Sequence, residues 1–222
     1  MIKKTKIPWE EIDFVLLDMD GTLLDKYFDD YFWEEFVPEQ YAKKKEIPVE
    51  EAKRTLLQRY KEREGTLIWT DIDYWSHCFD LNLPALKETV ADRVKVHEGV
   101  FPFLEFLKEA KKQVALLTNA HPKAINVKLN RVPLRPYFHK IISSSDLGYS
   151  KEAIGFWEKA QQLVGFVNKR SLFVDDNEQI LIVARQFGIK HLLYKSYASS
   201  RIVRQNSTQF PSLQYFNEII PD

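Results

Sequence analysis

Two aspartates, Asp18 and Asp20, stand two residues apart at the end of a strand expected over residues 13–18. Alternate residues of a strand point to the same side, and ligands of open α/β sheets bind beyond the carboxyl ends of strands, so both carboxylates are expected in one pocket. Two adjacent negative charges attract a divalent cation. Gly21 permits a sharp turn close to a ligand, and Thr22 adds a hydroxyl. An ordinary surface turn is the alternative, but it would need neither the second aspartate nor the Thr-Leu-Leu-Asp sequence that follows.

Two further apolar runs, at residues 114–118 and 172–174, also end in polar side chains. The hydroxyl of Thr118 would face the same crevice as the first aspartate pair, although a threonine at a strand end can instead cap the following helix. The second run is followed by Asp175 and Asp176, which repeats the pattern of a buried strand ending in two acids. The sequence therefore predicts three strands that carry polar groups at their carboxyl ends.

A lysine, Lys151, stands at the start of a helix expected over residues 151–164. A positive charge near the start of a helix is disfavoured by the helix dipole. We therefore favour a functional role for Lys151 over the alternative of a solvated surface lysine.

Strands and helices alternate through most of the chain, which favours an α/β fold with a Rossmann-like parallel sheet and helices on both faces. We expect strands at residues 13–18, 114–118, 140–143, 172–174 and 190–194, and helices at residues 100–112, 121–131, 151–164 and 178–187. Gly188 is expected to end the last of these helices. Residues 196–208 are interpreted as a surface loop, and residues 210–220 as a short terminal helix.

Residues 27–95 interrupt this alternation. They contain no convincing strand and are rich in helix-forming, aromatic and charged residues. We interpret them as a helical cap domain inserted after the first strand, with residues 1–26 and 96–222 forming the core domain. The charged stretches at 43–46 and 50–64 are interpreted as solvated faces.

The composition favours a globular protein and gives no sign of a nucleic-acid or membrane partner. The chain has 222 residues, of which 45% are hydrophobic and 29% charged, as expected for a globular protein with one sizeable core. Basic and acidic residues both number 32, so the overall charge gives no reason to expect nucleic acid or an anionic membrane as a partner. The single Cys78 excludes an intramolecular disulfide, and no apolar signal or membrane-spanning run is present, which favours the cytoplasm. The oligomeric state is left open.

The motifs resemble those of the haloacid dehalogenase-like (HAD) hydrolase superfamily. Residues 18–25 match its first motif, DxDGTLLD, without a mismatch. Thr118 resembles the second motif, whose hydroxyl binds a phosphoryl oxygen, and Lys151 resembles the third, whose lysine neutralises phosphate and nucleophile. Residues 175–176 resemble the acidic fourth motif. A glutamate, Glu152, follows the lysine where many relatives have proline.

This resemblance implies a Mg²⁺ site formed by Asp18, Asp20, Asp176 and Asp175. Asp176 would be the main ligand of the fourth motif, and Asp175 would bind the metal either directly or through another group. Some relatives carry a further acid where this chain has Ile180, so Asp175 or water would fill that coordination position. Zinc is not indicated, because the five histidines are scattered and the cysteine has no partner at a metal-ligand spacing.

The resemblance also implies a mechanism for phosphoester hydrolysis. Asp18 would attack phosphorus and form an aspartyl-phosphate, while Lys151 and Mg²⁺ offset the charge. Asp20 would give a proton to the leaving alcohol and later accept one from the attacking water. The haloacid dehalogenases of this superfamily lack this second aspartate and act on carbon, which favours phosphate chemistry here.

Beyond the motifs, the chain is similar to the bacterial GMP/IMP 5′-nucleotidase branch of the superfamily. The similar segments are Trp9 and residues 15–25, 28–33, 37–39, 73–76, 116–122, 173–176 and 186–189. They span nearly the whole chain, cap included. This similarity implies hydrolysis of purine nucleoside 5′-monophosphates to nucleoside and phosphate.

Aromatic side chains of the cap are candidates for stacking on a purine, although packing within the cap is favoured for any single ring. They are Tyr27, Phe28, Tyr31, Phe32, Trp33, Trp69, Tyr74 and Trp75. Asn119 and His121 follow Thr118 and are candidates to contact ribose or phosphate, but His121 could instead begin the helix.

Two other functions stay open. A sugar-phosphate or phosphoglycolate phosphatase would share every catalytic residue, so only a panel of substrates separates it from a nucleotidase. A binding module that kept the fold but lost turnover is disfavoured, because all four motif positions are intact.

Overall fold

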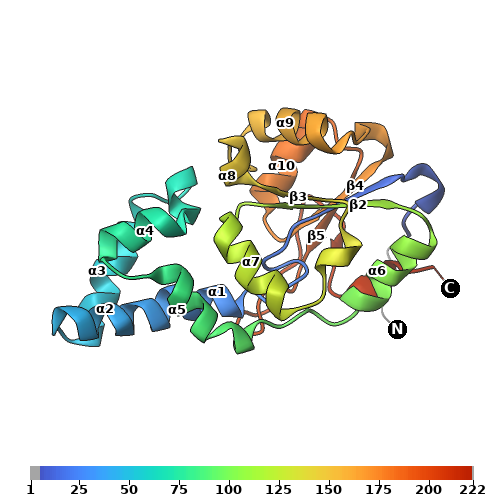
Figure 1. Ribbon diagram of the computed structural model, residues 1–222. Helices are drawn as coiled ribbons and strands as arrows, with labels where there is room; N and C mark the ends of the chain where they lie inside the picture. Colours follow the sequence, from blue (N-terminus) through green and yellow to red (C-terminus); the bar gives the residue numbers. More distant parts are fainter. Residues whose placement is uncertain (1–5, 222) are drawn as a thin grey trace.

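The computed structural model describes residues 6–221. Its centre is a six-stranded sheet with the order β3-β2-β1-β4-β5-β6, in which every neighbouring pair is parallel (Figure 1). The strands are β1 (Phe14–Leu17), β2 (Gln113–Thr118), β3 (Lys140–Ser143), β4 (Ser171–Asp175), β5 (His191–Lys195) and β6 (Ser212–Leu213). The predicted α/β class with a parallel sheet is confirmed.

Helices cover both faces of the sheet, which is why its central strands are apolar on both sides. In β1, Leu16 packs in the same buried cluster as residues of α9 (Ile154–Val164) and α10 (Glu178–Phe187). Val15 and Leu17 point the other way and share a cluster with α6 (Val100–Glu109) and α7 (Pro122–Arg131). Figure 1 shows these two pairs of helices on opposite sides of the sheet.

Residues 27–95 form a group of helices beside the sheet, drawn from blue to green in Figure 1, and contain no strand. The helices are α1 (Tyr27–Tyr31), α2 (Val37–Lys45), α3 (Val49–Lys61), α4 (Ile72–Phe79) and α5 (Leu83–Thr89). A π-helical turn, Phe32–Phe36, joins α1 to α2; Pro38 follows it and has no backbone N–H for the usual helical bond. Among the described residues, no helix is long and apolar enough to cross a membrane.

The two ends of this helical segment are joined by backbone hydrogen bonds. Asp25 N donates to Lys95 O at 2.9 Å, and His97 N donates to Leu23 O at 2.9 Å. An isolated antiparallel bridge pairs Leu24 with Val96. The chain therefore leaves the sheet region and returns to it at the same place.

The strand register places the predicted acids side by side. Leu17, the last residue of β1, lies opposite Val174 of β4 and Leu116 of β2. The residues that follow these positions, including Asp18 and Asp175, therefore emerge together at the carboxyl ends of the strands.

Three predicted elements differ from those observed. The prediction of a terminal helix over 210–220 is wrong. Within this range, β6 pairs with β5 at the edge of the sheet, and only a 3₁₀ turn, Phe216–Ile219, follows. The helix expected at 151–164 begins at Ile154, because residues 151–153 form a turn and Ala153 is extended, with φ −110° and ψ 138°. The helix expected at 100–112 ends at Glu109, and Lys111 then adopts a left-handed backbone conformation. A short helix, α8 (Ser144–Leu147), was not anticipated.

Candidate functional site

Three carboxylates, those of Asp18, Asp175 and Asp176, meet at the carboxyl ends of β1 and β4. Each offers an oxygen that lies within 4.8 Å of the others. Lys151 reaches this cluster from the loop before α9, and its Nζ donates to Asp18 Oδ1 at 2.5 Å and to Asp175 Oδ2 at 2.7 Å. The structure therefore brings together four of the residues that the sequence predicted for one site.

Burial and neighbouring charges both shift the pKa values of this cluster. Burial raises the pKa of Asp18 to about 6, although the ammonium of Lys151 opposes this rise. Burial, together with the charges of Asp18 and Asp175, raises the pKa of Asp176 well above its usual range. Burial acts to lower the pKa of Lys151, but the neighbouring carboxylates raise it overall. When all three carboxyls are ionised, one ammonium leaves a surplus of negative charge that a bound cation would offset.

The site has the donor set that a divalent cation requires. Asp18 Oδ2 is buried and has no hydrogen-bond partner among the described residues. Both oxygens of Asp175 already accept hydrogen bonds, from Asn177 N at 2.8 Å and from Lys151, so Asp18 and Asp176 are the better-placed ligands. Hard oxygen ligands with surplus negative charge fit Mg²⁺.

The position of Gly21 depends on its lack of a side chain. Its φ is 90°, and an added Cβ would lie 2.3 Å from Asp176 Oδ2. A larger residue would be strained in this conformation and would also displace the carboxylate. The predicted need for glycine beside the aspartate pair therefore has two physical causes.

Asp20 pairs with a lysine and is not grouped with this three-carboxylate cluster. Its Oδ2 lies 2.6 Å from Lys128 Nζ, and its side chain is 22% exposed. Burial raises the pKa of Asp20 to about 7, with Lys128 acting to lower it and Asp29 to raise it. The carboxylate thus lines the cavity but is not grouped with the other predicted metal ligands, so a side-chain role in metal binding stays a prediction.

Thr118 and Asn119 both line the cavity, but their polar atoms have different partners. Thr118 is buried, and its Oγ1 accepts a hydrogen bond from Ala120 N at 3.0 Å. The side chain of Asn119 holds the lysine loop: its Oδ1 accepts from Lys151 N at 2.9 Å, and its Nδ2 donates to Glu152 Oε2 at 3.0 Å. Glu152, the departure from the common motif, therefore fixes the path of this loop.

Three charged residues of the site were not anticipated from the sequence. Lys128 Nζ contacts Asp29 Oδ2 at 2.5 Å in addition to Asp20, and Lys87 Nζ contacts Asp29 Oδ1 at 2.5 Å. Burial acts to raise the pKa of Asp29, but Lys128 and Lys87 lower it overall. The available signal was the apolar spacing of α7, which places Lys128 among Ile125 and Leu129 rather than on the solvated face.

A cavity of about 580 Å³ extends from the carboxylates to the helical segment. Trp33, Trp69 and Tyr60 line its far end, together with Leu57. Of the other predicted stacking rings, Phe28, Phe32 and Trp75 are buried in the interior. This volume lies in the range typical of small-molecule sites, about 300–1,000 Å³.

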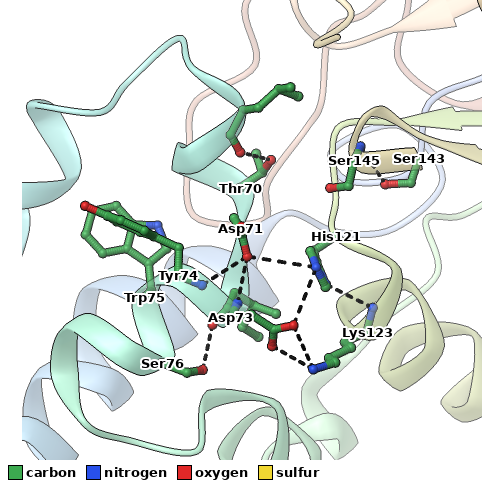
Figure 2. A network of polar contacts seen from close by, with 12 residues as sticks. Thr70, Asp71, Asp73, Tyr74, Trp75, Ser76, His121, Lys123, Ser143 and Ser145 are labelled. Atoms are coloured by element: carbon green, nitrogen blue, oxygen red, sulfur yellow. Dashed lines mark hydrogen bonds and ion pairs between the residues drawn. The ribbon is translucent and has the colours of Figure 1, made fainter. Parts of the chain in front are cut away.

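A second group of acids lies where α4 meets α7 (Figure 2). Asp71 caps α4 by accepting from Asp73 N and Tyr74 N. Lys123 Nζ donates to Asp73 Oδ2 at 2.7 Å, and His121 Nε2 lies 3.9 Å from both Asp71 and Asp73. His121 also caps α7, because its Nδ1 accepts a hydrogen bond from Lys123 N at 3.3 Å. Since His121 lines the cavity as well, its contact with ribose or phosphate stays a prediction.

Comparison with known proteins agrees with this arrangement. A family model described as haloacid dehalogenase-like hydrolase matches residues 12–188. The chain is 40% identical over 215 residues to the GMP/IMP nucleotidase YrfG of Escherichia coli (strain K12), and the match covers 97% of each chain. The GMP/IMP nucleotidase YrfG of Shigella flexneri matches with the same figures.

Solved structures share the fold along almost the whole chain. A HAD phosphatase from Thermococcus onnurineus has a TM-score of 0.79 at 21% identity, with 93% of this chain and 95% of that chain covered. The HAD-hydrolase YfnB from Bacillus subtilis, bound to magnesium, has a TM-score of 0.63 at 15% identity, with 93% and 96% covered. At these identities the likeness concerns the fold.

Proposed function

Because this chain belongs to the haloacid dehalogenase-like hydrolases, we propose that it hydrolyses purine nucleoside 5′-monophosphates, with GMP and IMP as substrates. The observation that carries the proposal is the end-to-end similarity to a GMP/IMP nucleotidase, 40% identity over 97% of both chains. The matched length includes residues 27–95, the part of the chain that lines the far end of the cavity. Fold alone would leave the substrate open, since one fold supports many reactions.

In the proposed reaction, Asp18 attacks the phosphorus atom in line with the ester oxygen. A bond forms between a carboxylate oxygen and phosphorus while the bond from phosphorus to the nucleoside oxygen breaks. Lys151 lies close enough to Asp18 to offset charge on the transferred phosphoryl group. Water then hydrolyses the aspartyl-phosphate, which releases phosphate and restores the carboxylate.

Asp20 is assigned the proton transfers. As the phosphorus–oxygen bond breaks, its protonated carboxyl gives a proton to the leaving 5′ oxygen, and the resulting carboxylate later accepts one from the attacking water. Its position on the cavity wall, two residues from Asp18, supports this role. Thr118, also on this wall, is assigned to bind a phosphoryl oxygen through its hydroxyl.

We propose Mg²⁺ as the cofactor, held by Asp18 and Asp176 with Asp175 supporting them. Asp18 Oδ2, which has no hydrogen-bond partner in the described part of the chain, and the gathering of three carboxylates support this assignment. When bound, Mg²⁺ neutralises charge on the carboxylates and on the phosphoryl oxygens. The relative YfnB is bound to magnesium in its own structure.

The helical segment is proposed to act as the cap that recognises the base, with residues 27–95 as the cap domain and residues 1–26 and 96–222 as the core domain. Trp33 and Trp69 are the predicted stacking rings that line the cavity, so we assign the purine to this end. A nucleotide with its base at the cap and its phosphate at the carboxylates would span the cavity. A small-molecule substrate and a cytoplasmic location agree with the balanced charge and the free Cys78.

The proposal is tested by measuring phosphate release from GMP, IMP, AMP, UMP, phosphoglycolate and glucose phosphates, with Mg²⁺ and with EDTA. We expect strong preference for GMP and IMP, and loss of activity in EDTA. Preference for phosphoglycolate or sugar phosphates would keep the chemistry but overturn the substrate. No turnover of any compound would favour a binding module.

A further inference from the structure

Asp20 stands at the end of a row of buried charges that runs into the helical segment. In spatial order the row is Lys87, Asp29, Lys128 and Asp20, so positive and negative groups alternate. The successive contacts measure 2.5, 2.5 and 2.6 Å. The proposed reaction assigns a step to the last member alone.

The two lysines of this row are removed from water. The side chains of Lys87 and Lys128 are 1% and 2% exposed, respectively. Burying an ammonium group is costly unless carboxylates lie close to it, and each of these groups has at least one such partner. The Nζ of Lys87 also lies 4.3 Å from the centre of the Phe32 ring. Because solvent screens these buried charges less than surface charges, the contacts hold the four side chains more tightly than a surface pair would.

The elements that carry the row come from two parts of the chain. Lys128 extends from α7 of the sheet region, whereas Asp29 extends from α1 and Lys87 from α5. The Nζ of Lys128 contacts Oδ2 of Asp20 and Oδ2 of Asp29, so its ammonium is held between two carboxylates. This contact occupies one oxygen of Asp20 and leaves Oδ1 as the atom that can exchange a proton with substrate.

We propose that Lys128 is a positioning residue for the proton transfer by Asp20, and that Asp29 fixes Lys128 in place. The inference rests on the proposed function, which gives Asp20 the role of the acid. Held by Lys128, the carboxyl of Asp20 presents a fixed oxygen to the leaving group instead of rotating freely. A misplaced acid protonates the leaving oxygen less effectively even when the nucleophile is intact.

Two substrates with different leaving groups separate this role from direct substrate binding. The 5′ oxygen of IMP leaves poorly unless it is protonated, whereas the phenolate of p-nitrophenyl phosphate leaves readily without a proton. The quantity to compare is kcat/KM, because it reports the steps up to phosphoryl transfer and is not affected by later hydrolysis of the aspartyl-phosphate. A loss of proton transfer should therefore appear with IMP and not with p-nitrophenyl phosphate.

The main variant is Lys128→Met, which leaves Asp29 paired with Lys87. We expect kcat/KM for IMP to fall about 100-fold, which is the low end of what a general acid contributes, while kcat/KM for p-nitrophenyl phosphate changes by less than about threefold. Asp29→Asn should show the same selective loss, but smaller, because Lys128 keeps its contact with Asp20. Lys108→Met is the control, since Lys108 is an exposed lysine of α6 whose side chain is 71% exposed.

Asp29→Asn leaves Lys87 buried without a carboxylate, so the double variant Asp29→Asn/Lys87→Met provides a second test if the single variant does not fold. Thermal melting of each variant establishes that it is folded. Equal losses with both substrates would mean that Lys128 binds the phosphate directly, and unchanged kcat/KM for both would mean that it has no part in the reaction; either result overturns the inference. The proposed function is tested separately, by whether the unmodified protein hydrolyses IMP at all.

Discussion

Two clusters of acidic side chains lie near the same cavity, and they differ mainly in their access to water. Asp18 and Asp175 have side chains that are 7% and 1% exposed, and they share Lys151. Asp71 and Asp73 have side chains that are 39% and 47% exposed, and Asp73 pairs with Lys123, which is 53% exposed. Both clusters include three groups with metal-ligand geometry, the second with His121.

Burial, more than the number of acids, distinguishes the cluster to which we assign chemistry from an ordinary surface contact. In the buried cluster, each charge affects its neighbours strongly, and one carboxylate oxygen has no hydrogen-bond partner within residues 6–221. In the exposed cluster, solvent screens the charges and Asp71 is already used as a helix cap. We therefore assign chemistry to the first cluster and only a contact between α4 and α7 to the second.

The largest expected effect follows removal of the proposed nucleophile. Asp18→Asn should lower kcat for IMP by about 10⁵-fold, because an amide cannot form the aspartyl-phosphate. Phosphate release by the purified variant measures this, and circular dichroism shows whether the fold is kept. Full activity in Asp18→Asn would overturn the assignment of Asp18 as the nucleophile. The buried cluster would then have no more claim to the chemistry than the exposed cluster.

Lys151→Met should come next. Loss of this charge removes the group that offsets phosphoryl charge, so we expect kcat/KM to fall roughly 10²- to 10³-fold. The variant also leaves buried carboxylates without their cation, which should lower the free energy of unfolding by about 3–5 kcal/mol. Urea denaturation without Mg²⁺ measures the second effect. A stability unchanged within error would show that the buried pair contributes no more than a surface pair.

The binding of Mg²⁺ should distinguish the two clusters, by an effect smaller than those of Asp18→Asn and Lys151→Met. Mg²⁺ should raise the melting temperature of the protein, because a ligand of the native state stabilises it by mass action. In Asp176→Asn this shift should require at least about tenfold more Mg²⁺. In Asp73→Asn, the matched change in the exposed cluster, the shift should match that of the unmodified protein. If instead Asp73→Asn weakened the shift, the metal would have to be reassigned to the exposed cluster.

The smallest effect is expected from the exposed pair itself. Asp73→Asn should change the free energy of unfolding by less than about 1 kcal/mol, and moderate salt should reduce even that difference. Denaturant titrations at low and high ionic strength give the comparison. A large loss of stability that persists in salt would show that this contact is as strong as a buried one.

The parts of the fold and site that could be predicted are those encoded by local pattern. The apolar runs that end in Asp18, Thr118 and Asp175 correspond to β1, β2 and β4, and the parallel register then brings their ends together. The motif resemblance pointed to Lys151 in the same way. The family and its α/β fold could therefore be inferred before any coordinates were known.

The rest depends on contacts between distant residues. Nothing near Lys128 in the sequence indicates that it lies between Asp20 and Asp29, which are 108 and 99 positions away. Nor does composition distinguish Trp33, which lines the cavity, from Phe32, which is buried beside it. The edge strand β6 was missed because its two residues gain a strand conformation only from pairing with β5.

The hydrogen bonds that tie Asp25 to Lys95 and Leu23 to His97 have an evolutionary consequence. An insertion whose two ends are fastened together can grow, shrink or be exchanged without shifting β1 within the sheet. Selection could thus change the segment that is proposed to recognise the substrate while the carboxylate at the end of β1 stays where it is. The same property makes the segment a natural unit for transplantation between relatives, with residues 25 and 95 as the points of joining.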